Sequence, residues 1–230
     1  MHSGHATGSD PSLVLAAGVG ARRGRNCGLR SVSFRMEGPL PGGSILGIAA
    51  SQPSAASAVI RLLAGLSPPT HGELRVLGED LTTSRGRAAV RRQVGVAHRP
   101  SRLRPRLAVR GLVTRAARRA RLPGYDREVL TAGILDRLAL TQWADVPVRL
   151  APTAIACRAG LAAAAVHEPA LLLLDGLLDG LTPRELANLA DGVRDLAVDT
   201  AVIAAGRDVA ALGLACDEVL TLSEGILAAA

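Results

Sequence analysis

Residues 44–66, SILGIAASQPSAASAVIRLLAGL, contain the local pattern that decides the fold. The apolar run SILGIAA predicts a buried strand. Residues 55–66 repeat apolar positions at helical spacing, with Gly65 near the end of the expected helix. A short loop, SQPS, joins the two elements, so the stretch predicts a strand, a loop and a helix of an α/β chain.

This order of elements is that of a phosphate-binding loop, but the residues that usually hold phosphate are missing. Such a loop works through glycine N–H groups and one lysine. The whole chain contains no lysine, because all 27 of its positive side chains are arginine. A compositional bias of the genome explains arginine on the surface, but it does not explain the loss of lysine from a site that requires it.

Composition limits the class of protein. With 230 residues and 48% hydrophobic residues, the chain is long and apolar enough for one large domain with a sizeable core. Cys27, Cys157 and Cys216 are odd in number and lack metal-ligand spacing, which favours a reduced, cytoplasmic protein. The apolar residues 12–21 are too few to span a bilayer and are followed by arginines, so we expect membrane contact only through a partner.

Positive charge is concentrated in one segment. Residues 85–127 contain 14 arginines and a single acid, Asp126, although the net charge of the chain is only +7. Such a segment predicts contact with lipid headgroups, nucleic acid or an acidic partner. A solvated arginine-rich helical face is the alternative.

The rest of the chain alternates strand and helix patterns around a helical block. Strands are expected at 13–19, 29–36, 44–50, 73–77, 94–98, 170–176, 200–206 and 217–225. The pattern between residues 107 and 167 is helical, and Pro183 is placed to begin another helix. We therefore expect a disordered N-terminus at 1–11 and one α/β domain at 12–230, with a helical subdomain at about 100–167.

Several segments in their order and spacing resemble the ATP-binding subunit of ABC transporters. The resemblance runs from about Leu29 to Leu227, and its most specific piece is RLLAGLSPPTHGELRVLGEDL at residues 61–81. It implies a P-loop NTPase-like nucleotide-binding domain with a mostly parallel core sheet, N-terminal antiparallel strands and an inserted helical subdomain. It also implies Mg-ATP as cofactor, a transmembrane partner, a homo- or heterodimer with another nucleotide-binding subunit, and a cytoplasmic position at the inner face of the membrane.

Two residues of the family's nucleotide site remain in this resemblance. The family's phosphate loop aligns with residues 50–58, and its lysine position is Ala56. Ser57 keeps a hydroxyl where Mg²⁺ would sit, and Asp175 keeps the acid at the end of LLLLD. The catalytic glutamate position is Gly176. Ser57 and Asp175 are therefore the predicted remnants of a Mg-ATP site, and no catalytic or dedicated metal-binding residue is assigned.

The other functional positions of the family are also replaced. No aromatic residue for the adenine ring lies near Arg23, and the family's loop glutamine and switch histidine align with Arg99 and Arg207. The signature motif aligns with residues 151–155, APTAI, and the loop after the catalytic position with residues 179–182. The resemblance thus implies loss of both halves of the shared ATP site.

Three functions follow from these observations. The first is a catalytically degenerate subunit, structural or regulatory, that contacts a transmembrane partner through the arginines Arg99, Arg102, Arg104, Arg106 and Arg110. The second is an active ATP-hydrolysing subunit with unorthodox motifs. The third is an arginine-rich nucleic-acid-binding module, which is disfavoured because Phe34, Tyr125 and Trp143 are the only aromatic residues.

Overall fold

The computed structural model describes residues 12–23, 26–38 and 44–229, and ten strands within these ranges form one curled mixed sheet. The strand order is β5-β4-β1-β2-β10-β9-β3-β8-β7-β6. The strands are β1 (Ser12–Arg23), β2 (Asn26–Glu37), β3 (Ile45–Ala50), β4 (His71–Val76), β5 (Glu79–Asp80), β6 (Val94–His98), β7 (Leu171–Asp175), β8 (Ala201–Gly206), β9 (Glu218–Ser223) and β10 (Ile226–Ala229).

The helices follow the strands in an alternating order. They are α1 (Pro53–Leu63), α2 (Ser84–Gln93), α3 (Val109–Arg119), α4 (Gly124–Arg137), α5 (Thr153–Ala165), α6 (Pro183–Ala197) and α7 (Val209–Ala215). Three short 3-10 helices are η1 (Pro100–Arg102), η2 (Thr141–Trp143) and η3 (Val148–Leu150).

The sheet has a parallel part and an antiparallel part, as the family resemblance implies. Strands β9, β3, β8, β7 and β6 lie parallel to their neighbours in this order. Strands β2, β1, β4 and β5 pair antiparallel. β10 joins the two parts, because it pairs antiparallel with β9 and forms a parallel bridge to β2 between Ile226 and Ser31.

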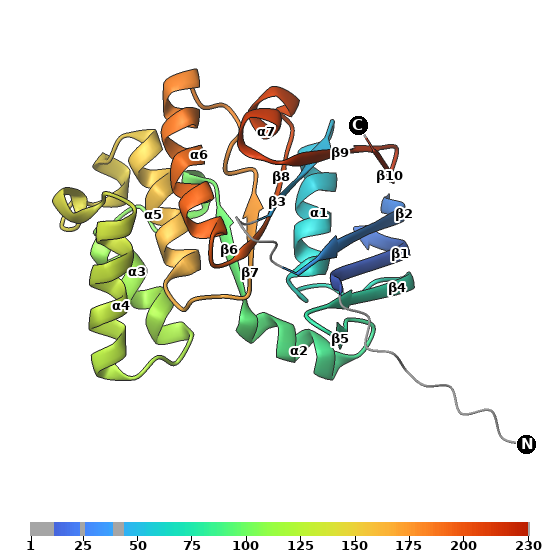
Figure 1. Cartoon of the computed structure of the whole chain (residues 1–230), viewed down its shortest axis with the longest axis horizontal. Coiled ribbons are helices and arrows are strands. Elements are labelled where there is room, and N and C mark those ends of the chain that lie inside the picture. Colours follow the sequence, from blue (N-terminus) through green and yellow to red (C-terminus); the bar gives the residue numbers. More distant parts are fainter. Residues whose placement is uncertain (1–11, 24–25, 39–43, 230) are drawn as a thin grey trace, which may run out of the picture.

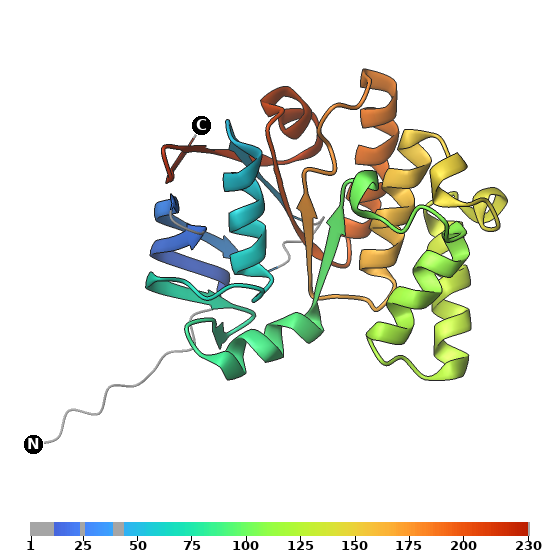
Figure 2. The ribbon, with the colours of Figure 1, turned by 180° about the vertical axis from the view of Figure 1, so that it is seen from behind.

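The buried strands explain the apolar runs of the sequence. Every residue of β3, β7 and β8 is buried, since α1 covers one face of these strands and α5, α6 and α7 cover the other (Figures 1 and 2). A strand buried on both faces has no polar side, so its sequence is continuously hydrophobic. The two faces bear separate cores, both built almost entirely from aliphatic side chains.

The helical block lies at the β6 edge of the sheet. Helices α3, α4 and α5 pack together there, on the opposite side of the molecule from β1, β2 and β4 (Figure 1). The predicted domain limits stay a prediction, and residues 1–11 lie outside the described residues.

Sequence reasoning missed several elements. Helix α2 and the short strands β5 and β10 were not predicted. Helix α1 begins at Pro53, two residues earlier than expected, with the ring of Pro53 in the first turn, where a missing N–H costs nothing. This early start shortens the loop that follows β3.

Candidate functional site

Two backbone donors that follow β3 are already used within the chain. Pro53 has no N–H, and the N–H groups of Ala55 and Ala56 both donate to the carbonyl oxygen of Gln52, at 2.9 and 3.4 Å. A loop that holds phosphate instead aims successive N–H groups at the ligand. The side chain of Ala56 is buried in the core.

Asp175 is the centre of a buried polar cluster at the carboxyl end of β7. Its Oδ1 accepts a hydrogen bond from Ser57 Oγ at 2.7 Å, and its Oδ2 accepts one from Arg102 Nη1 at 2.5 Å. His98 Nδ1 lies 3.3 Å from the same Oδ2. His98 reaches it because β6 pairs with β7 in parallel and places His98 opposite Asp175.

The cluster holds Asp175 in its charged form. Burial raises the pKa of this carboxyl, but hydrogen bonds from His98 and Ser57 and the charge of Arg102 lower it by more. The pKa of Asp175 therefore lies below its ordinary value, although only 5% of the residue is exposed. The positive charge that balances it comes from a residue of the same chain.

A second acid, Asp179, forms hydrogen bonds near Asp175, with the loop after β8. Its Oδ1 accepts hydrogen bonds from the backbone N–H groups of Arg207 and Asp208, at 2.8 and 3.2 Å. Arg207 Nε lies 3.9 Å from Asp179 Oδ2. Gly206 makes this approach possible, because a Cβ there would lie 2.6 Å from Asp179 Oδ1. Asp179 thus fixes the loop that follows β8.

The residue after Asp175 has a backbone conformation that suits glycine. Gly176 has φ +63°, in the left-handed region that side chains disfavour. A Cβ at Gly176 would lie 3.3 Å from both Arg99 Nε and Asp179 Oδ2. Gly176 therefore lies between an arginine and an acid.

The structure brings together only some of the predicted site residues. Ser57 and Asp175 are in direct contact, and their role as a remnant site stays a prediction. Arg102, expected to contact a partner, bonds to Asp175 of its own chain, and Arg99 lies beside Gly176. Contact of these arginines with a partner stays a prediction.

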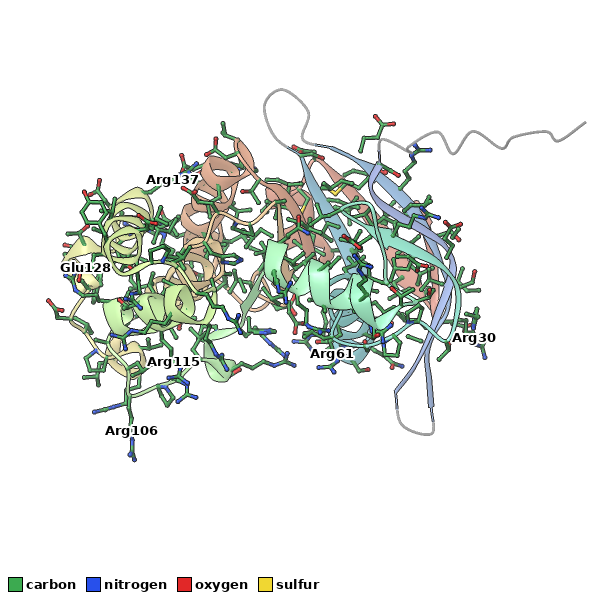
Figure 3. All side chains as sticks on the ribbon, turned by 90° about the horizontal axis from the view of Figure 1, so that it is seen from below. Arg30, Arg61, Arg106, Arg115, Glu128 and Arg137 are labelled. Carbon is green, nitrogen blue, oxygen red and sulfur yellow. The ribbon has the colours of Figure 1, made fainter. Side chains whose placement is uncertain are left out.

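The remaining predicted partner-contact arginines are exposed. Arg104 and Arg106 lie on the surface, and Arg110 Nε is 3.4 Å from Asp145 Oδ1. Arg106 extends away from the ribbon on the same side as Arg115 of α3 (Figure 3).

Sequence reasoning missed His98 and Arg102 as partners of Asp175. The strand pattern VGVAH placed His98 at a strand end, but its position beside LLLLD depends on a pairing between distant segments. Arg102 lies on η1, whose single turn has no periodic signal.

The described ranges contain neither a metal-ligand cluster nor a membrane-spanning helix. No group of three or more histidine, cysteine, aspartate or glutamate side chains there could hold a metal ion. Across the same ranges, each helix is either too short or too polar to cross a membrane.

Comparisons with known proteins define the class. The sequence profile of the family described as "ABC transporter" matches residues 34–178, which is more than half of the chain. The chain belongs to this family, as an ABC-type ATP-binding domain.

Individual relatives agree with this assignment. The chain is 30% identical over 209 residues to the methionine import ATP-binding protein MetN 2 of Burkholderia mallei, covering 88% of this chain and 51% of the relative. It is 31% identical over 192 residues to a methionine import ATP-binding protein MetN of Xanthomonas campestris, covering 80% of this chain and 56% of that one. The chain thus spans about half the length of these relatives.

A solved structure has the same fold. It is described as cbiO1 from Clostridium perfringens, part of the ABC transporter complex cbiONQ, and it superimposes with a TM-score of 0.78. The match covers 95% of this chain and 88% of that chain at 18% identity, so it supports the fold alone.

Proposed function

We propose that this chain is a catalytically degenerate ATP-binding-type subunit, which serves as a structural or regulatory half beside a transmembrane transport partner. The observation that carries the proposal is the bond from Arg102 to Asp175. The guanidinium supplies, from within the chain, the positive charge that a magnesium ion would otherwise bring to this acid.

The surrounding residues do not fit a magnesium–nucleotide complex. One oxygen of Asp175 already accepts a hydrogen bond from Arg102, a positively charged side chain of the same chain, where a metal ion would bind. The N–H groups of Ala55 and Ala56 are used by Gln52, and no lysine exists in the chain to neutralise phosphate. A bound nucleotide would have to break contacts that are already satisfied.

The expected effect on catalysis is large. Removal of one preorganised donor to a developing charge lowers the rate by about 10²–10³-fold. In the alignment that the resemblance implies, Ala56, Gly176 and Arg207 take the positions of the family's lysine, glutamate and histidine. Such losses are not additive, but any one of them can reduce turnover to background.

The proposed partner contact rests on charge. Arg104, Arg106 and Arg110 are exposed beside the helical block and can meet acidic side chains of a partner or anionic headgroups at the inner face of a membrane. ATP-binding relatives named for methionine import, and a structural neighbour described as part of a transporter complex, support such an assembly. Dimerisation with another nucleotide-binding subunit belongs to the same proposal.

ATP turnover tests the catalytic part. We expect no hydrolysis above background by the purified chain with Mg²⁺, and no difference between the native chain and Asp175→Ala. Robust hydrolysis that Asp175→Ala abolishes would favour the alternative of an active subunit, for which the contact between Ser57 and Asp175 is the supporting observation.

Copurification tests the partner. A tagged chain should recover a multi-span membrane protein from detergent extracts, and a variant with Arg104→Glu and Arg106→Glu should recover less of it. Recovery of a lone soluble chain under the same conditions would count against the proposal.

A further inference from the structure

A second basic region lies apart from the Asp175 cluster, near the amino end of β6. It is a cleft of about 480 Å³ between α2, β6, α3 and α5. Its walls contain four arginines and a histidine, Arg91, Arg92, Arg119, Arg121 and His167, and no acid is among its described lining residues.

We propose that this cleft binds a compact anion that contains two or three linked phosphate groups. This inference does not depend on the proposed function. Guanidinium groups form paired hydrogen bonds with phosphate oxygens, and several of them around one cleft can hold more than one phosphate.

The charge in the cleft lacks a counter-charge. Arg91 Nη1 donates to the carbonyl oxygen of Gly65 at 2.7 Å, which fixes this side chain but does not neutralise it. The side chains of Arg92, Arg119 and Arg121 have no hydrogen bond or ion pair with any residue in the described ranges. Mutual repulsion of these charges is relieved when an anion binds.

Helix ends account for only part of this charge. Arg91 and Arg92 lie in the last turn of α2, and Arg119 lies in the last turn of α3. Positive charges at these positions interact favourably with the helix dipole. A helix carboxyl end carries about half a negative charge. Two such ends balance about one of the four guanidinium charges, so an excess remains for a ligand.

The floor of the cleft has room for a ligand because its residues are small. Gly95, Ala116, Ala163 and Ala164 line it. Gly95 lets α5 approach β6 closely, since a Cβ there would lie 2.2 Å from the carbonyl oxygen of Ala164. Burial lowers the pKa of His167, more than a backbone hydrogen bond at Val94 raises it, so the charge comes from the arginines.

The lining favours a short phosphate chain over nucleic acid. The described lining residues of the cleft include no aromatic side chain, so bases would have no surface for stacking. The two possible sources of the phosphate groups are a free oligophosphate and a lipid headgroup with several phosphates.

The test is a titration with inorganic tripolyphosphate, followed by calorimetry and by the shift in thermal midpoint. We expect binding that weakens as salt is raised. Arg92→Gln and Arg121→Gln should each weaken it about tenfold, and the double variant should abolish it. The matched control is Arg184→Gln, an exposed arginine of α6 that loses the same charge elsewhere.

Three results would overturn the proposal. One is no binding of tripolyphosphate by the folded native chain. Another is an equal loss of affinity in Arg184→Gln and Arg92→Gln, which would indicate unspecific attraction. The third is loss of binding in Arg102→Gln with none in Arg92→Gln, which would place the anion beside the phosphate loop. Circular dichroism of each variant verifies its fold before titration.

Vesicles identify the source of the phosphate. Sedimentation with vesicles that contain a bisphosphorylated inositol lipid, but not with phosphatidylcholine alone, would assign the cleft to a headgroup if Arg92→Gln reduces it. Binding of tripolyphosphate without such sedimentation would assign the cleft to a free oligophosphate. A negative result in the tripolyphosphate titration or in the vesicle sedimentation leaves the ATP turnover test unaffected, because that test depends on Asp175.

Discussion

The arginines at the two ends of the parallel strands lie in opposite electrostatic surroundings. At the carboxyl ends, Arg102 bonds to Asp175, and Arg207 lies beside Asp179. At the amino end of β6, Arg92 and Arg119 face a cleft without an acid among its described lining residues. An arginine near a buried acid forms an ion pair within the chain. Arginines without such an acid nearby leave a positively charged surface.

The largest expected effect comes from removing Asp175, the acid that pairs with Arg102 at the carboxyl ends of the parallel strands. Asp175→Ala should lower the free energy of unfolding by about 3 kcal/mol, because the buried hydroxyl of Ser57 and the guanidinium of Arg102 lose their acceptor. Urea denaturation measures it. Asp191→Ala, which removes an exposed acid of α6, is the matched control and should change stability by less than about 0.5 kcal/mol. Equal effects of the two variants would contradict a stabilising cluster.

Removing the arginine of the same pair should have a smaller effect, and one that depends on pH. Arg102→Gln should cost about 1 kcal/mol near pH 7, because the Arg102 side chain is 45% exposed and solvent screens its charge.

The pH dependence has a definite sign. The pKa of Asp175 is lowered from 3.8 by folding, so the contribution of the pair is present above pH 3.8 and is lost as pH falls through the folded pKa. Urea curves at neutral pH and at successively lower pH should therefore show the effect of Arg102→Gln shrink only below pH 3.8, as the pH approaches the folded pKa of Asp175. A cost that stays constant with pH would show that packing of the side chain, and not its charge, is responsible.

One substitution in the basic cleft at the amino end of β6 should stabilise the protein. Arg121 follows α3 with φ +63°, and its N–H bonds to Arg118 O while that of Leu122 bonds to Ala117 O. This pattern at a helix end favours glycine. Arg121→Gly should raise the free energy of unfolding by about 0.5–1 kcal/mol. Arg121→Ala separates the contribution of charge from that of the backbone, and a loss of stability in the glycine variant would refute the prediction.

The smallest expected effect concerns the reactivity of the Cys157 thiol, which lies near the loop after β7. Burial, aided by the charge of Glu185, raises the pKa of Cys157 to about 12, and its Sγ lies 3.8 Å from the carbonyl oxygen of Leu177. Alkylation of Cys157 at mildly alkaline pH should be very slow in the native chain, since the thiolate is rare.

The same thiol reports on the loop after β7. In Asp175→Ala, we expect faster alkylation of Cys157, because the segment that contains Leu177 loses the anchor that precedes it. Peptide mass spectrometry identifies the modified cysteine. Unchanged alkylation in this variant would mean that the loop keeps its position without the acid.

Much of the fold could be predicted from the sequence because its strands are buried on both faces. The runs SILGIAA, LLLLD and TAVIAA have no polar side, so they identify β3, β7 and β8 without knowledge of their neighbours. Helix α2 could not be identified in this way. Its sequence, SRGRAAVRRQ, buries only Gly86 and Val90, which is too few positions to establish a helical period.

The candidate site was predictable only in part, for a similar reason. Ser57 lies within α1 and Asp175 ends β7, so both belong to elements with a strong sequence signal, and the family resemblance implied that they share a site. Arg102 is 73 residues from Asp175 in the sequence, and it reaches the acid only through the single turn of η1 after β6. Neither composition nor local pattern specifies such a turn.

The aliphatic cores have a consequence for spectroscopy. The chain has one tyrosine and one tryptophan, Tyr125 in α4 and Trp143 in η2, and both belong to the helical block. Intrinsic fluorescence therefore reports on that block, while the sheet contributes almost no emission. An emission curve and a far-ultraviolet dichroism curve with different denaturation midpoints would show that the helices and the sheet unfold separately.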